Sequence, residues 1–106
     1  MLRRADYLGT YASGRRFVGR WLVLFVRPAA GACARLGVTI TKKTGSAVVR
    51  NRLRRRLREL FRRNDGFRSA VDVVVNVRPG AEETTFAELS RDFQKLAARA
   101  GAGGTP

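Results

Sequence analysis

Basic side chains dominate one stretch of the chain, residues 42–63. This stretch holds ten of the 22 Lys and Arg residues and a single acid, Glu59, so it carries +9 of the formal net charge of +14. Its basic residues are Lys42, Lys43, Arg50, Arg52, Arg54, Arg55, Arg56, Arg58, Arg62 and Arg63. Guanidinium groups bind phosphates through paired N–H donors and stack on flat rings such as bases. The chemistry indicated is therefore binding to a nucleic acid.

The composition excludes several kinds of catalytic site. The chain has no histidine and only one cysteine, Cys33, so no His-based triad, Cys–His pair or His-containing zinc site can form. A metal held by carboxylates is the remaining enzymatic option, and Glu82, Glu83 and Glu88 do lie close together in sequence. Acids at that position also suit the positive end of the helix predicted there. We therefore expect neither catalytic residues nor a metal site in this chain.

Length and charge limit the organisation and the partners. A chain of 106 residues that is 44% hydrophobic should form one domain, which we predict over residues 1–100, followed by a disordered tail over 101–106. The excess of cations attracts polyanions at long range, so nucleic acid is the expected partner, with an anionic membrane surface second. The lone thiol and the lack of an apolar leader predict a cytoplasmic protein.

Apolar periodicity predicts elements in the order α-β-β-α-β-α. They are a helix over residues 3–11, one strand or two short strands over 17–26, a strand over 36–41, a helix over 47–63, a strand over 71–77 and a helix opened by a capping box over 85–88. Ser46 is the expected N-cap of the second helix, and residues 64–66 should end it. The order predicts an α+β fold, a two-layer sandwich of an about four-stranded mixed sheet and three helices.

The helix predicted over residues 47–63 separates its apolar and basic residues onto opposite sides. The apolar side carries Val49, Leu53, Leu57 and Leu60. The opposite side carries Asn51, Arg54, Arg55, Arg58 and Arg62, with Arg50 and Arg52 flanking it. A solvated face is the usual reason for a charge run, but like charges at i,i+4, such as Arg54 and Arg58, destabilise a helix by about 0.2–0.5 kcal/mol per pair. A polyanion would relieve this repulsion, so we predict that this face binds RNA. A membrane-bound helix is less compatible with an apolar stripe that the core needs.

Residues 42–55, KKTGSAVVRNRLRR, resemble the signature of the bacterial ribonuclease P protein subunit. That signature joins a Lys-rich strand end to Gly-x-Ala-Val, Arg-Asn-Arg, an aliphatic residue and two basic residues, with a further Arg at position 58. Residues 3–11, residues 14–20 (GRRFVGR) and the pair Arg78-Pro79 are also similar to the family. Arg54 stands where lysine is common, and the stretch before Arg3 is shorter than usual, so a few basic residues are expected to be missing at the N-terminal start.

The resemblance implies a division of labour with an RNA. In this family the RNA subunit holds the Mg²⁺ ions and hydrolyses the phosphodiester that joins the 5′ leader to precursor tRNA, while the protein binds both RNAs. The implied partners are thus the catalytic RNA and precursor tRNA, with no membrane and no obligate protein partner. The implied fold is similar to that of ribosomal protein S5 domain 2, with a left-handed crossover between the strands before and after the basic helix, where the usual hand is right.

The family's functional residues carry over onto two sets of positions. The implied contacts with the RNA subunit are Lys42, Lys43, Arg50, Asn51, Arg52, Arg54, Arg55 and Arg58. The implied cleft for the single-stranded leader is formed by Tyr7, Tyr11, Phe17, Val23 and Phe25. Aromatic rings stack on bases without reading their sequence, which suits a leader of any sequence. Tyr7 and Tyr11 are equally compatible with a plain core role.

Two alternatives from other functional classes remain open. A ribosomal or other structural RNA-binding protein would share this size, charge and lack of catalytic groups, and only the Arg-Asn-Arg signature argues against it. A metal-dependent nuclease acting alone would need two or three converging carboxylates. The RNA that co-purifies with the chain would distinguish a ribosomal protein from a ribonuclease P subunit. A metal-dependent nuclease would require the acidic residues to lie close together in the fold.

Overall fold

The structure, a computed structural model, describes residues 4–28, 34–63 and 71–100. Its elements are α1 (Arg4–Ser13), β1 (Arg15–Val18), β2 (Leu22–Pro28), β3 (Arg35–Thr39), a 3₁₀ turn η1 (Lys42–Thr44), α2 (Ala47–Arg63), β4 (Val71–Val77), a 3₁₀ turn η2 (Ala81–Glu83) and α3 (Phe86–Arg99). The predicted order is confirmed, and the strand expected over residues 17–26 is two strands. The predicted end of α2, the C-terminal tail and Cys33 lie outside the described residues.

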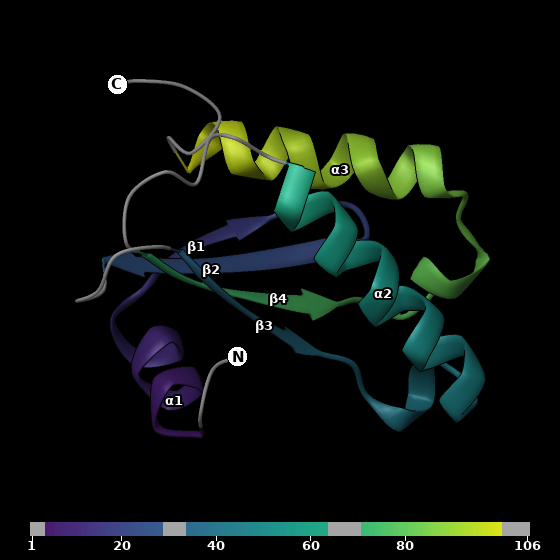
Figure 1. The fold of residues 1–106 in the computed structure, drawn as a ribbon, viewed down its shortest axis with the longest axis horizontal. Coiled ribbons are helices and arrows are strands. Elements are labelled where there is room, and N and C mark those ends of the chain that lie inside the picture. The colour runs from purple at the N-terminus through teal and green to yellow at the C-terminus, as the bar shows by residue number, and fades with distance from the viewer. Residues whose placement is uncertain (1–3, 29–33, 64–70, 101–106) are drawn as a thin grey trace.

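The four strands form one mixed sheet in the order β1-β2-β4-β3 (Figure 1). β2 pairs antiparallel with β1 and with β4, whereas β3 and β4 are parallel neighbours joined through α2. In Figure 1 both of these strands point to the right, β3 lies below β4 over most of its length, and α2 crosses in front of the sheet. The β3–α2–β4 crossover is therefore left-handed, against the usual right-handed rule and as the family resemblance implied.

The hydrophobic core lies between one face of the sheet and the helices α2 and α3. It includes Leu22, Leu24, Val73, Val75, Val77, Leu53, Leu57, Leu60, Leu89, Phe93 and Leu96, all at most 6% exposed. Side chains alternate between the two faces of a strand, so the intervening residues of β2, β3 and β4 face the other way. α1 packs on that second face. The two predicted layers are therefore the sheet and the pair α2 and α3, and α1 lies on the opposite side of the sheet. None of the described helices is long and apolar enough to cross a membrane.

Both long helices begin at hydroxyl caps. The Ser46 hydroxyl accepts a hydrogen bond from the Val49 amide at 3.3 Å, and the Thr85 hydroxyl accepts one from the Glu88 amide at 3.1 Å. The predicted capping box of α3 is only half formed, because the Glu88 carboxylate bonds to the Thr84 hydroxyl and does not reach back to Thr85. Gly45, just before α2, has φ +152°, a backbone region that essentially only glycine occupies. This explains a glycine at the head of the basic signature.

Candidate nucleic-acid interface

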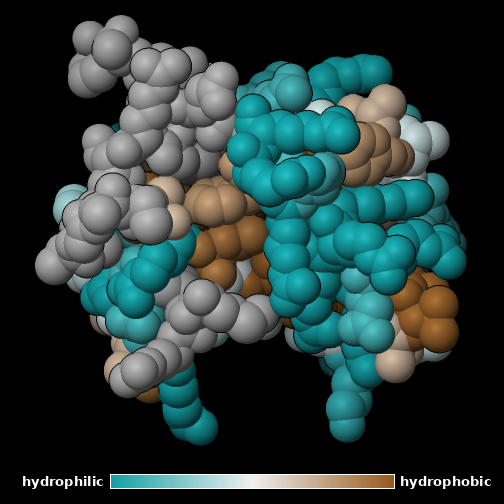
Figure 2. Space-filling model, in the orientation of Figure 1, coloured by the Kyte–Doolittle hydropathy of each residue, from teal (hydrophilic) through white to brown (hydrophobic). Residues whose placement is uncertain are grey.

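α2 presents its basic residues to solvent because its apolar stripe faces the core. Leu53, Leu57 and Leu60 are buried, and Val49 packs partly buried beside them. The opposite side carries Asn51, Arg52, Arg55, Arg58 and Arg62, which are exposed, and Arg50 and Arg54, which are partly buried. Lys42 and Lys43 are exposed on η1, directly before the helix. We call these nine residues the basic face of α2, and Figure 2 shows the hydrophilic surface over this helix.

Most of the arginines of the basic face lack a carboxylate partner. Glu59 is the only acid of α2, and it pairs with Arg62 and, at 3.5 Å, with Arg63. The hydrogen bond from Arg62 lowers the pKa of Glu59 and raises that of Arg62. Within the described part of the chain, no acid pairs with Arg50, Arg52, Arg54, Arg55 or Arg58. Arg50 instead donates to the carbonyl of Gly45, and Arg54 to the amide oxygen of Asn51, both at 3.3 Å. Uncompensated cations on one helix face create a positive potential that attracts phosphates.

On the second face of the sheet, α1 is held by two tyrosines. The ring of Tyr7 lies against Gly37 of β3, where a Cβ atom would come within 2.6 Å of it. The Tyr11 hydroxyl donates to the side-chain oxygen of Asn76 at 2.7 Å and lies 3.0 Å from the Thr39 hydroxyl. Its ring meets Phe25 edge-on with centroids 4.9 Å apart. Both tyrosines therefore contribute to packing, while each remains only partly buried.

Beside α1 this face of the sheet stays partly open. Val23 and Phe25 of β2 are half-buried there, and their register partners on β1 are Val18 and Arg16. Paired residues of antiparallel strands share a face, so these two belong to the same surface. Val18 is 44% exposed and Arg16 is exposed. The sequence alone did not indicate that Arg16 and Val18 lie on this surface, because the register of β1 on β2 was needed to place them. We call Tyr7, Tyr11, Arg16, Val18, Val23 and Phe25 the cleft face.

Phe17 does not belong to the cleft face, which corrects the sequence-based assignment. It pairs with Leu24, a core residue, and is 7% exposed in the hydrophobic core. The guanidinium of Arg15 lies 5.0 Å from the centroid of its ring. The reason is the alternation of the strand, which sends Phe17 towards α3 and its neighbours Arg16 and Val18 to the cleft side.

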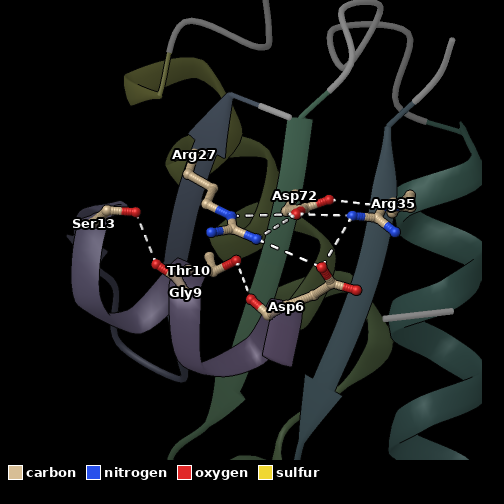
Figure 3. Close-up of polar contacts among 7 residues, drawn as sticks. All are labelled: Asp6, Gly9, Thr10, Ser13, Arg27, Arg35 and Asp72. Carbon is tan, nitrogen blue, oxygen red and sulfur yellow. Dashed lines mark hydrogen bonds and ion pairs between the residues drawn. The ribbon is translucent and has the colours of Figure 1, made fainter. Parts of the chain in front are cut away.

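An ion cluster around the buried Asp72 joins α1 to the sheet (Figure 3). The fully buried Asp72 of β4 accepts hydrogen bonds from Arg27 of β2 at 3.2 and 3.3 Å and from Arg35 of β3 at 2.9 and 3.1 Å. Asp6 of α1 lies 3.6 Å from Arg27 and 3.4 Å from Arg35. The hydrogen bond to Asp72 raises the pKa of Arg35. The cluster joins one helix and three strands, and no local sequence pattern indicated it.

The acidic residues considered for metal chemistry have structural roles or lie apart. Glu82 accepts a hydrogen bond from the Gly80 amide at 2.9 Å, and Glu88 bonds to Thr84 at the start of α3. Over residues 4–28, 34–63 and 71–100, no three Asp, Glu, Cys or His side chains come together in a way that could hold a metal ion. The donor set of these residues therefore does not fit a protein-held metal centre.

Comparisons with known proteins bear on the family and the fold of the chain. A family model described as Ribonuclease P matches residues 1–101. The ribonuclease P protein component of Gluconacetobacter diazotrophicus is 40% identical over 105 residues, which is 96% of this chain and 90% of that one. The component from Lachnoclostridium phytofermentans is 35% identical over 98 residues, covering 91% and 84%. The solved RNase P protein from Thermotoga maritima has a TM-score of 0.84 and 31% identity, covering 92% and 94%. The chain therefore belongs to the ribonuclease P protein family, whose members are subunits of an endoribonuclease that processes tRNA.

Proposed function

We propose that the chain binds the catalytic RNA subunit of ribonuclease P through the basic face of α2 and holds the single-stranded leader of precursor tRNA on the cleft face. The first part rests on the row of arginines on α2 that have no acidic partner within residues 4–28, 34–63 and 71–100. The stability of the fold does not require such a row of arginines, since like charges on one helix face repel each other and destabilise the helix. Phosphates of the RNA subunit would supply the missing counter-charges.

The RNA-subunit surface comprises Lys42, Lys43, Arg50, Asn51, Arg52, Arg54, Arg55 and Arg58. The Ser46 cap and Gly45 define the backbone turn between η1 and α2. This turn sets the position of the Lys42 and Lys43 backbone relative to the arginines of the helix. Asn51 accepts a hydrogen bond from Arg54, which leaves its amide N–H₂ available as a donor. The helix thereby presents several donors to a phosphate backbone from one face.

The leader surface comprises Tyr7, Tyr11, Val23 and Phe25, to which the register of β1 adds Arg16 and Val18. Partly exposed rings and aliphatic side chains offer stacking surfaces that accept any base, and Arg16 supplies a cation for the leader's phosphates. Mature tRNA has no strand to place there. Binding on this face would therefore favour the precursor over the product.

Catalysis is assigned to the RNA subunit. The chain has no histidine, and the described acids do not converge, so we place the Mg²⁺ ions on the RNA subunit and its substrate. When bound there, Mg²⁺ supplies an activated water and stabilises the charge that develops on the phosphate. The residues of this chain act by neutralising the RNA backbone and positioning the leader.

The proposal is tested by the salt dependence of binding to the cognate RNA subunit. Arg52→Ala and Arg58→Ala each remove an exposed guanidinium that pairs with no acid among the described residues. Each should therefore reduce the magnitude of the slope of log K against log salt by about 0.7–0.9, the contribution of one phosphate contact. Arg91→Ala is the matched control, because Arg91 is exposed on α3, away from the basic face. Equal losses from all three variants would mean diffuse charge attraction and would refute a specific surface on α2.

A further inference from the structure

A groove runs along the second half of α2 where α3 begins. Its lining residues are Arg55, Arg56, Arg58, Glu59, Arg62 and Phe86. Phe86 is the first residue of α3, so the groove joins the basic face of α2 to a second helix. Figure 2 shows an apolar patch at the upper right, where α3 begins in Figure 1, bordered by hydrophilic side chains.

Phe86 is the aromatic floor of this groove. The periodicity of α3 predicts it as a core residue together with Leu89 and Phe93, but only the latter two are fully buried. Phe86 lies one turn earlier, at the start of the helix, and it packs against the core while remaining partly exposed. The guanidinium of Arg56 lies 5.8 Å from the centroid of its ring. The solvent-accessible part of Phe86 is therefore an aromatic ring that carries a cation over one face.

The charge around Phe86 is strongly positive. Four arginines and one acid line the groove, and that acid, Glu59, is held by Arg62 and Arg63. Within the described residues neither Arg55 nor Arg58 pairs with a carboxylate. Such a rim disfavours an apolar peptide or a cationic ligand and favours an anion that carries a flat apolar group. A nucleotide has both parts.

We propose that one unpaired base of the RNA subunit stacks on Phe86 by taking the place of the Arg56 guanidinium over its ring, while its flanking phosphates bind Arg55 and Arg58. This rests on the proposed function, because the groove continues the surface that binds the RNA subunit. It extends that surface from α2 onto α3. The recognition is tolerant of base identity, since every base has a π face.

The test compares Phe86 variants in equilibrium binding to the cognate RNA subunit over a range of salt concentrations. Phe86→Leu keeps an apolar side chain but removes the aromatic face, and it should weaken binding by about tenfold, within the range measured for loss of one base stack. The salt slope should stay at the wild-type value, because stacking releases no counterions. Phe86→Tyr and Phe86→Trp should retain wild-type affinity.

A second readout does not depend on how well Phe86→Leu folds. Trp21 is the only tryptophan, so Phe86→Trp in a Trp21→Phe background places the sole indole in the groove. Its fluorescence should be quenched saturably by the RNA subunit. Affinity unchanged in Phe86→Leu, or fluorescence unchanged in the tryptophan variant, would overturn the stacking site. If at the same time Arg52→Ala and Arg58→Ala lower the salt slope, the proposed function stands, whereas normal slopes in both would refute that function itself.

Discussion

Replacing Tyr11 separates the two roles that the structure allows for it. Its hydroxyl bonds to Asn76 at 2.7 Å and lies 3.0 Å from the Thr39 hydroxyl, while its ring meets Phe25 at the edge of the cleft face. Tyr11→Phe removes the hydroxyl and keeps the ring. Tyr11→Leu removes both. Stability should respond to either change, and leader binding only to the second.

The magnitudes follow from these contacts. Loss of the hydroxyl removes a partly buried hydrogen bond to Asn76, which contributes about 1 kcal/mol. For a domain of this size that lowers Tm by roughly 4–8 °C. Tyr11→Leu adds the loss of the edge-to-face contact with Phe25, about 0.5–1.5 kcal/mol. If the ring also stacks on a leader base, Tyr11→Leu should cost about 1–3 kcal/mol of precursor binding, which is roughly tenfold or more in affinity.

The assay measures the Kd of the reconstituted enzyme for precursor tRNA with a leader of several nucleotides and for mature tRNA. The Kd for mature tRNA divided by the Kd for precursor tRNA measures the contribution of the leader. We expect Tyr11→Phe to keep the wild-type ratio and Tyr11→Leu to lower it about tenfold, with mature tRNA bound equally by all three proteins. A wild-type ratio in Tyr11→Leu would make Tyr11 a packing residue only. An equal loss in both variants would mean that the placement of α1, and not stacking, determines leader binding.

Two further variants test the elements that position the two surfaces. Asp72→Asn removes the negative charge and one of the two acceptor oxygens that Arg27 and Arg35 share. Because both guanidinium groups are partly exposed, unfolding in urea should show a loss of about 1–3 kcal/mol, and leader preference should fall while binding to the RNA subunit is kept. Unfolding at the wild-type urea concentration would contradict a structural role for the cluster. Gly45→Ala places a Cβ 3.1 Å from Val49 at a φ of +152°. It should therefore lower the free energy of unfolding by about 1–3 kcal/mol and weaken binding to the RNA subunit. An unchanged Tm would show that the turn before α2 adapts to the new side chain without cost.

Periodicity in the sequence was sufficient to predict the helices and strands and the basic face of α2. α2 runs over the predicted residues, with Ser46 as its cap and its leucines in the core. Those features are local, since a helix that buries Leu53 and Leu57 must turn Arg55 and Arg58 outward. The left-handed crossover was different. Local patterns favour the common hand, and only the resemblance of the signature to a known family indicated the rarer one.

The cleft face could be predicted only in part, because it depends on strand register. Phe17 and Phe25 are both aromatic strand residues, yet pairing with Leu24 places Phe17 in the core, and pairing with Val74 places Phe25 under α1. The same register brings Arg16 and Val18 to the surface. The cluster around Asp72 joins residues far apart in sequence, so no short-range signal could reveal it. Phe86 fits the apolar period of α3 but is its first residue, where the core covers it only in part.

We infer that this chain assists an RNA catalyst and does not cleave RNA itself. The most direct test is cleavage of precursor tRNA at low Mg²⁺ by the protein alone, by the cognate RNA subunit alone and by the two together. We predict no cleavage by the protein, slow cleavage by the RNA and fast cleavage at the mature 5′ end by the combination. Cleavage at that position by RNA-free protein, purified from contaminating nucleases, would contradict the account.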